Sequence, residues 1–154
     1  MPLSSAAHAR LYRASRGRLG TRVGGHPVLL LTTIGRRTTR PRTTPVQYVR
    51  DGERLIVVAS NAGRERAPAW SLNLRDQPAC RVQVGPCAFA ARAVEARGTE
   101  RDRLWDAACA VNPAYERAQA RSPRSFAIVA LERSPGLGQG DRLPPAESAP
   151  TTER

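Results

Sequence analysis

Short β-rich segments separated by tight-turn residues restrict the fold of this chain more than any other feature. Asp51-Gly52 stands between two β-rich segments, and Asp-Gly in that setting is the strongest short-range signal of a β-hairpin. Gly85-Pro86 joins a second pair of segments in the same way. Six segments are predicted as strands: 27–34, 43–50, 53–60, 79–84, 88–96 and 125–131. The first of these is continuously apolar, which predicts burial on both faces.

Strands linked by hairpins predict an antiparallel sheet, and six of them in about 110 residues close most simply into a small barrel. Helices are predicted at 4–19 and 68–76, and a third begins at 99–102, where the sequence has the form of a capping box. The expected fold class is therefore mainly β with flanking helices (α+β). The strands and helices do not alternate in the manner of a dinucleotide-binding fold.

The chain divides into three predicted segments. Residues 1–22 form a basic N-terminal helical segment, and residues 23–133 form the barrel domain. Residues 134–154 are rich in Pro, Gly, Ser and Thr, so this tail is expected to be disordered.

Positive charge is concentrated in the first third of the sequence. All 25 basic residues are Arg, and the formal net charge is +12. Residues 1–50 hold ten Arg and no Asp or Glu, whereas the remainder is nearly neutral. This asymmetry indicates an anionic partner, either nucleic acid, a membrane surface or a polyanionic small molecule, although a merely soluble basic surface explains it equally well. Aromatic residues make up only 5% of the chain, so a nucleic-acid-binding module is the least favoured class and no nucleic acid is expected.

The longest aliphatic run, 28–31, is far shorter than the roughly 20 apolar residues of a membrane-spanning helix. The N-terminus also lacks the apolar stretch of a signal peptide. We therefore expect a cytoplasmic protein, with weak peripheral association of 1–22 with the inner face of the membrane through its five arginines. Three cysteines without a CxxC pair predict neither a metal site nor a disulfide framework.

The loop at 35–42 is the first candidate binding element. Arg36, Arg37, Arg40 and Arg42 stand among threonines, between a buried strand and its neighbour. One guanidinium group can bind two oxygens of a phosphate or carboxylate group (bidentate binding), and nearby hydroxyl groups can supply further hydrogen bonds. The loop lacks the glycine spacing and lysine of an NTP-binding loop. An anion-binding loop and a solvated turn both remain open from these residues alone.

A second candidate element combines a strand end with a helix start. Ser60 and Asn61 end one predicted strand, and Trp70 and Asn73 lie in the helix that follows. Small and polar residues let a flat ligand approach the backbone, and Trp70 offers a stacking surface, although core packing is the simpler role for this side chain. The sequence shows no Ser-His-acid set and no carboxylate pair, so an enzyme of this sequence needs a bound cofactor.

The chain resembles the deazaflavin-dependent nitroreductase and quinone reductase family, which uses coenzyme F(420), in the run LLLTTIGRRTTRPRTTPVQYVRDGERLIVVASNAG and in PAWSLNL. The resemblance covers roughly 12–132. It implies a split β-barrel of the FMN-binding type and hydride transfer from the reduced cofactor to an electron-poor acceptor such as a quinone, enone or nitro compound. It also implies a small-molecule acceptor and a homodimer, as in related flavin proteins.

The resemblance assigns the cofactor contacts residue by residue. The arginine loop would grip the phosphate and oligoglutamate tail, and the strand end and helix start would flank the ring. The residues so assigned are Gly35, Arg36, Arg37, Thr38, Arg42, Thr44, Pro45, Ala59, Ser60, Asn61, Ala69, Trp70 and Asn73. FMN is the alternative cofactor, but it carries one phosphate, whereas F(420) carries a phosphodiester and several carboxylates, which suits the arginine loop better.

The sequence departs from the family pattern at two places. Thr38-Thr39 stands where Ser-Gly is common in the loop, and Ala118 stands where many members have Tyr. Tyr115 is then the nearest hydroxyl and the expected catalytic residue facing the substrate. The alternative functions are a deazaflavin carrier with little turnover and an FMN-binding reductase.

Overall fold

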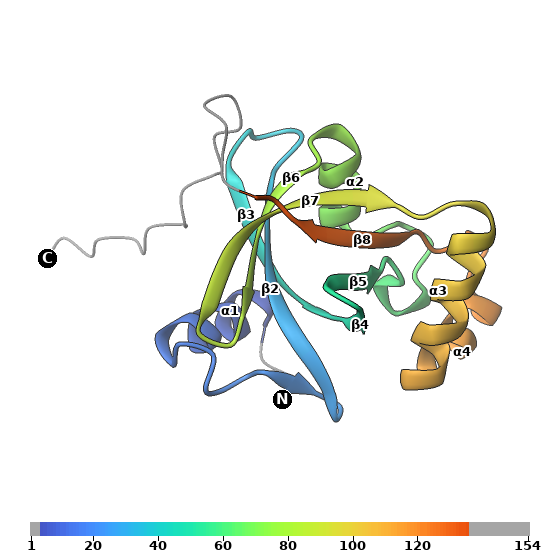
Figure 1. Cartoon of the computed structure of the whole chain (residues 1–154), viewed down its shortest axis with the longest axis horizontal. Coiled ribbons are helices and arrows are strands. Elements are labelled where there is room, and N and C mark those ends of the chain that lie inside the picture. Colours follow the sequence, from blue (N-terminus) through green and yellow to red (C-terminus); the bar gives the residue numbers. More distant parts are fainter. Residues whose placement is uncertain (1–3, 136–154) are drawn as a thin grey trace, which may run out of the picture.

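The computed structural model describes residues 4–135, and Figure 1 shows a curled sheet with helices around it. The strands are β1 (Arg22–Val23), β2 (His26–Ile34), β3 (Pro41–Gln47), β4 (Val49–Asp51), β5 (Arg54–Val58), β6 (Ala79–Val84), β7 (Cys87–Glu95) and β8 (Ile128–Arg133). The helices are α1 (Ser5–Ala14), α2 (Ala69–Asp76), α3 (Gly98–Val111) and α4 (Ala114–Arg121), with a short 3-10 turn η1 (Asn61–Gly63). Each of the six predicted segments contains a strand, but the segment at 43–50 is divided between two strands, and β1 was not predicted.

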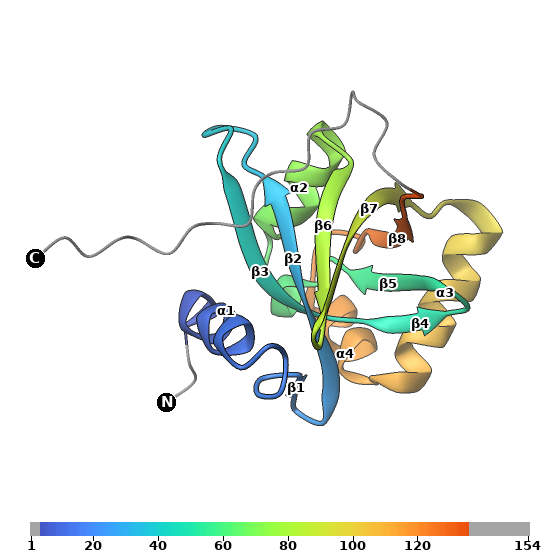
Figure 2. The same cartoon turned by 60° about the vertical axis from the view of Figure 1, so that its left-hand side comes forward.

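The sheet curls because two strands that follow each other in the chain, β3 and β4, pair near opposite ends of it. All paired strands are antiparallel, as predicted. The order is β1-β2-β6-β7-β8-β5-β4, with β3 also paired to β2. β3 and β4 therefore lie near opposite ends of the sheet, although only Tyr48 separates them in the chain. The sheet must curl until these ends meet, which makes a split half-barrel (Figure 2).

The break at Tyr48 corrects the single strand predicted over 43–50. The residues before it pair with β2 and those after it pair with β5. The Asp51-Gly52 hairpin is confirmed, because Asp51 pairs with Arg54 and Gly52 takes a positive φ of 60°.

The core lies inside the half-barrel and is centred on β2. Leu29 and Leu31 point into the main cluster, which includes Val57, Val82 and Leu131. The alternate residue Leu30 packs on the other face, against Ala9 and Tyr12 of α1. Burial of β2 on both faces is thus confirmed, and α1 is the element that covers the outer face.

α1 is held to the barrel by the buried Tyr12. Its hydroxyl donates to the carbonyl of Val28 at 3.1 Å and accepts the N–H of Gly85 at 2.7 Å. The helix predicted over 4–19 ends at Ala14, because Arg16 and Gly17 adopt positive φ. Gly17 touches the β6–β7 turn so closely that a Cβ would lie 2.2 Å from the Cα of Gly85. That contact fixes the chain direction after the helix.

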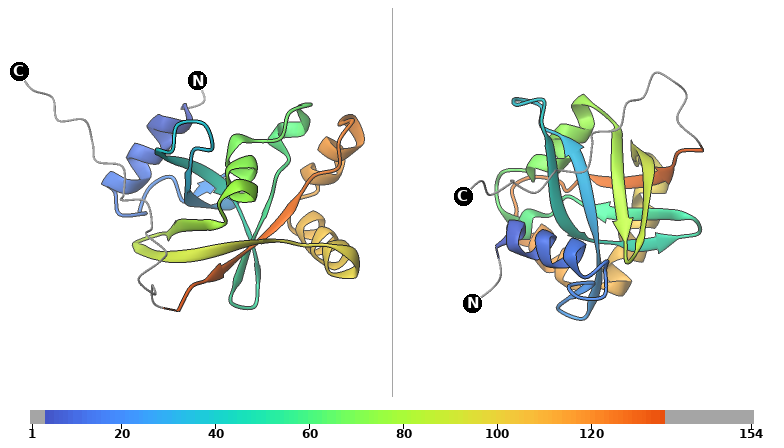
Figure 3. Two further views of the ribbon diagram at one scale, coloured as in Figure 1. Left: turned by 90° about the horizontal axis from the view of Figure 1, so that it is seen from above. Right: turned by 90° about the vertical axis from the view of Figure 1, so that its left-hand side faces the viewer.

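α3 and α4 pack at the end of the molecule opposite α1, and α2 lies between them and α1 (Figure 3). The capping box at 99–102 is wrong: α3 begins at Gly98, and its N-cap residue Arg97 makes no side-chain cap bond. α4 is absent from the predicted strand and helix order. The tail was predicted over 134–154, and its residues after Pro135 lie outside the described part of the chain.

Candidate functional site

Two cavities adjoin each other across α2. The first, of about 710 Å³, lies between α1, the β2–β3 loop and α2. The second, of about 890 Å³, lies between β3, the segment after β5 and α4. Thr44, Ala69 and Trp70 line both cavities. We call these the arginine cleft and the inner cavity.

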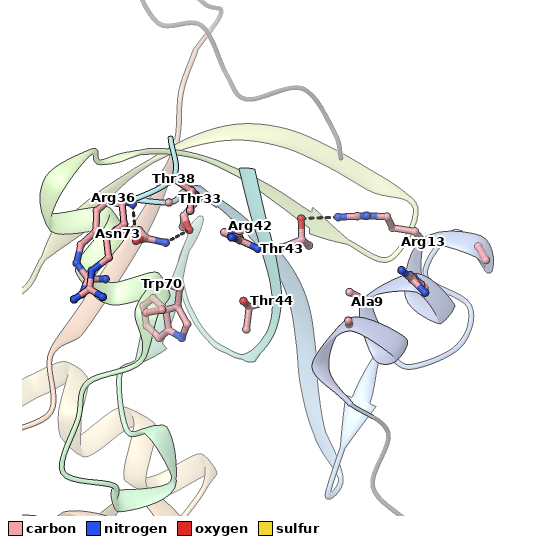
Figure 4. A pocket seen from close by; sticks show the side chains of 16 residues that line it. Ala9, Arg13, Thr33, Arg36, Thr38, Arg42, Thr43, Thr44, Trp70 and Asn73 are labelled. Atoms are coloured by element: carbon pink, nitrogen blue, oxygen red, sulfur yellow. Dashed lines mark hydrogen bonds between the residues drawn. The ribbon is translucent and has the colours of Figure 1, made fainter. Parts of the chain in front are cut away.

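The arginine cleft brings together most of the residues predicted to bind a cofactor. From the loop and β3 come Gly35, Arg36, Arg37, Thr38, Arg42 and Thr44, and from α2 come Ala69, Trp70 and Asn73. Among residues 4–135, no Asp or Glu lines it. Figure 4 shows Arg36 and Asn73 on one side, with Trp70 beneath them and Arg42 towards the middle.

The arginine loop is held in shape by its own backbone. The N–H of Gly35 donates to the carbonyl of Arg40 at 2.8 Å, and the N–H of Thr39 donates to the carbonyl of Gly35 at 2.7 Å. A side chain at position 35 would meet Thr38, since a Cβ there would lie 2.5 Å from its Oγ1. The loop is therefore a closed turn that projects Arg36 and Arg37 from a fixed base.

Asn73 joins the arginine loop to α2. Its side chain is 3% exposed, donates to Thr33 Oγ1 at 3.0 Å and accepts the N–H of Arg36 at 3.1 Å. These two hydrogen bonds hold the arginine loop against α2. Asn73 thus lines the cleft as predicted, and its bonds in the structure hold the loop.

The opposite wall of the cleft comes from α1, which sequence reasoning did not place there. Ala6, Ala9, Arg10, Arg13 and Ala14 line it, and Arg13 donates to Thr43 Oγ1, which also bonds Thr32 Oγ1 at 2.8 Å. Figure 4 places Arg13 across the cleft from Arg36. A signal was present, because these five residues recur at helical spacing on one face.

The inner cavity contains the remaining predicted residues. Pro45, Ser60, Asn61 and Tyr115 line it together with Ala118. Ala59 lines neither cavity, since its side chain is fully buried in the core. Of the thirteen residues assigned to the cofactor, only this one lies behind the cavity walls.

The strand end that borders the inner cavity is fixed by Arg124. Its guanidinium donates to the carbonyl oxygens of Ala59 and Ser60, each at 2.9 Å, and to that of Arg64 at 3.1 Å. It also lies 4.8 Å from the ring centre of Phe126, and burial lowers its pKa. Sequence reasoning missed this residue, because its partners lie about sixty positions earlier.

The turn after β5 has an unusual backbone. Asn61 and Ala62 have φ values of 45° and 54°, a region that costs energy for residues other than glycine. The side-chain amide of Asn61 donates to the carbonyl of Arg66 at 2.9 Å. Gly63 packs so closely on α4 that a Cβ would lie 3.1 Å from the carbonyl oxygen of Ala118. The surrounding contacts hold this strained turn in place.

Tyr115 presents a hydroxyl group that stays protonated. Burial raises its pKa to about 12, against the lowering effect of a hydrogen bond with the Asn112 side chain. At neutral pH it is therefore a hydrogen-bond donor. Ala118, one turn later on α4, lines the same cavity without a hydroxyl group.

Trp70 belongs to the main core cluster, where it is 7% exposed, and also borders both cavities. Trp105, which is partly buried, packs edge-on against Phe126 with ring centres 6.4 Å apart.

Within residues 4–135, no group of His, Cys, Asp or Glu side chains is arranged to hold a metal ion. No helix in that range has the length and apolar character needed to cross a membrane. The three cysteines are free thiols.

Comparison with known proteins gives a consistent result. A family model described as F(420)H(2)-dependent quinone reductase matches residues 5–133. An F(420)H(2)-dependent quinone reductase of Mycobacterium tuberculosis is 38% identical over 130 residues, which cover 82% of this chain and 87% of the relative.

Two solved structures are also similar. An F(420)H(2)-dependent reductase has a TM-score of 0.64 and 29% identity, and the match covers 69% of this chain and 94% of that one. A second structure, a domain-swapped dimer, has a TM-score of 0.66 and 26% identity, with coverage of 82% and 96%.

Proposed function

The chain belongs to the F(420)H(2)-dependent quinone reductase family, and from this premise we propose that its two cavities divide the reaction between them. It is an oxidoreductase, and its cofactor is coenzyme F(420). The arginine cleft takes the cofactor, and the inner cavity takes the acceptor. The observation that carries this division is the shared wall formed by Thr44, Ala69 and Trp70.

The residues of the arginine cleft fit a polyanionic, flavin-like molecule. In the described part of the chain, the arginines that line it are Arg10, Arg13, Arg36, Arg37 and Arg42, and no Asp or Glu of that part lines it. A phosphodiester and several carboxylates match such a surface better than the single phosphate of FMN, since each guanidinium can bind two oxygens. The arginines of the loop bind the phosphate and tail, while those of α1 bind from the other side.

Trp70 provides the apolar surface on which the ring packs, and Asn73 keeps Arg36 above it. When bound, the reduced deazaflavin supplies a hydride and a proton, which convert a quinone to its hydroquinone. Hydride transfer leaves negative charge on a quinone oxygen. The protonated hydroxyl of Tyr115 donates a hydrogen bond to that oxygen and so stabilises the charge.

The test is binding and turnover of the purified protein. F(420), FMN and FAD are titrated in parallel, and oxidation of the reduced cofactor is then followed with quinone, enone and nitro acceptors. We expect preferential binding of F(420) and turnover with quinones. Equal affinity for FMN would contradict the cofactor assignment, and tight binding without turnover would favour a carrier.

We also propose a homodimer, on the basis of the domain-swapped relative, and light scattering of the purified protein tests it. Weak association of α1 with an anionic membrane surface remains a further proposal. Ala9 and Tyr12 are buried against the sheet, so contact with a membrane surface would involve the exposed side chains of α1, which include Arg10 and Leu11. Sedimentation with anionic and neutral liposomes tests this, and equal sedimentation would refute it.

A further inference from the structure

Three arginines at the inner cavity have no role in the function proposed so far. Arg64 and Arg66 follow η1, and Arg121 is the last residue of α4. All three line the inner cavity, and none of the Asp or Glu residues between 4 and 135 does. All three are also exposed, so they lie where the cavity meets solvent.

The backbone that carries these arginines is anchored on both sides. The carbonyl of Arg64 accepts from Arg124 at 3.1 Å, and the carbonyl of Arg66 accepts from Asn61 at 2.9 Å. Arg121 belongs to α4, which packs on the same turn through the close approach of Gly63 to Ala118. The side chains therefore extend from fixed positions rather than from a freely moving loop.

None of the three arginines forms an ion pair with an Asp or Glu side chain within residues 4–135. The exposed Glu65 lies between Arg64 and Arg66 in the sequence. Three arginines with one adjacent carboxylate leave an excess of positive charge beside the cavity, which attracts anions.

The buried part of the lining is mainly apolar or aromatic. It includes Val46, Val58, Trp70 and Tyr115, with Asn112 as a buried polar residue. A ligand that satisfies both regions has a flat apolar ring at one end and a negative group at the other.

We propose that the acceptor carries an anionic substituent, a carboxylate or sulfonate on a quinone ring, which Arg64, Arg66 and Arg121 bind at the entrance of the inner cavity. This inference rests on the proposed function, which assigns the acceptor to that cavity. The ring carbonyl then faces Trp70 and Tyr115, and the substituent faces the arginines. The arginines act as specificity-determining residues and take no part in the hydride transfer.

The experiment compares naphthoquinone with its sulfonate in the F(420)-loaded enzyme. The variants are Arg64→Gln, Arg66→Gln, Arg121→Gln and the triple variant. The control is Arg92→Gln, which removes an exposed arginine of β7 that lines neither cavity. Each single variant should raise the KM for the sulfonate about threefold, and the triple variant about 30-fold, as expected for exposed ion pairs acting independently.

The KM for neutral naphthoquinone and both kcat values should change less than about twofold, since substituent binding is separate from the chemistry. Added salt should raise the KM for the sulfonate alone. Equal KM values for the two quinones in the unmodified protein would overturn the inference. Equal shifts for both quinones in the triple variant would overturn it as well.

A binding measurement separates this inference from the proposed function. Naphthalene sulfonate, which cannot be reduced, is titrated calorimetrically into the protein with oxidised F(420) bound. We expect binding that weakens in the triple variant and is unchanged in Arg92→Gln. If no quinone is reduced while this binding pattern holds, the proposed function fails and the anion site stands. If quinones are reduced and naphthalene sulfonate binds equally to all variants, the anion site fails alone.

Discussion

Replacing Arg124 with alanine removes the side chain that fixes the strand end at 59–60. The guanidinium makes three hydrogen bonds to backbone carbonyls and one contact with the Phe126 ring. Because the site is partly exposed, water replaces part of each bond, and a loss of about 1 kcal/mol per bond is reasonable. The cation–π contact adds about 0.5–1 kcal/mol. The free energy of unfolding should therefore fall by about 3–4 kcal/mol.

Urea unfolding of the purified variants measures this change. Arg75→Ala is the matched control, since its exposed ion pair with Glu95 contributes about 0–1 kcal/mol. The free energy of unfolding of Arg124→Lys should lie between those of Arg124→Ala and Arg75→Ala. One ammonium group cannot reach all three carbonyl oxygens that the guanidinium group binds.

The same change should act on one cavity more than the other. Ser60 and Asn61 line only the inner cavity, so the KM for a quinone should rise in Arg124→Ala while the Kd for F(420) changes less than about twofold. The reasoning is refuted if the free energies of unfolding of Arg124→Ala and Arg75→Ala differ by less than about 0.5 kcal/mol, because the loss of three hydrogen bonds predicts a much larger difference.

Other predictions concern separate parts of the molecule. Replacing Arg36, Arg37 and Arg42 together with alanine should weaken F(420) binding by about 1.5–3 kcal/mol for each charge-assisted bond lost, measured by titration; unchanged affinity would contradict the cleft assignment. Tyr115→Phe should lower kcat for quinone reduction about 10²-fold, and Ala118→Tyr should increase nitro reduction; unaffected turnover in Tyr115→Phe would remove its assigned role. Hydrogen bonds from Arg103 and Arg54 lower the pKa of Asp51, so its stabilisation is present above its unfolded pKa of about 4 and is lost as the pH falls through the folded value. The stability difference between the native chain and Asp51→Asn, measured by urea unfolding, should therefore shrink below pH 4 or so, and a constant difference would argue against the pairing. Burial raises the pKa of Cys80 to about 12, so a thiol reagent should modify Cys87 far faster than Cys80 in the folded protein.

The parts of the fold that depend on neighbouring residues could be predicted from the sequence. The turn at Asp51-Gly52 fixes the register of β4 and β5 locally, and the unbroken apolar run of β2 indicates its burial. The division at Tyr48 could not be predicted, because it depends on which distant strand each half pairs with. The capping box failed for a local reason, since α3 begins at Gly98, which places Thr99 inside the first turn and not at the N-cap position.

The candidate site shows the same division. The arginine loop and the strand end are contiguous in sequence, and their residues carry enough chemistry to indicate an anion site. The wall supplied by α1 depends on a bond between Tyr12 and Gly85, which are 73 residues apart. The role of Asn73 likewise depends on contacts with Thr33 and Arg36, about forty positions earlier. Side-chain type alone predicted its location at the site but not the bonds it makes there.

The position of β8 has a consequence for how this protein is made. β8 is the final described strand, yet it pairs with both β5 and β7 in the middle of the sheet. While a ribosome is still adding residues 96–127, both of those strands have an open edge, and β5 is paired on one side only, with β4. Open edges of this kind promote association with other chains before folding is complete. We therefore expect chains that lack β8 to associate more readily than the full chain.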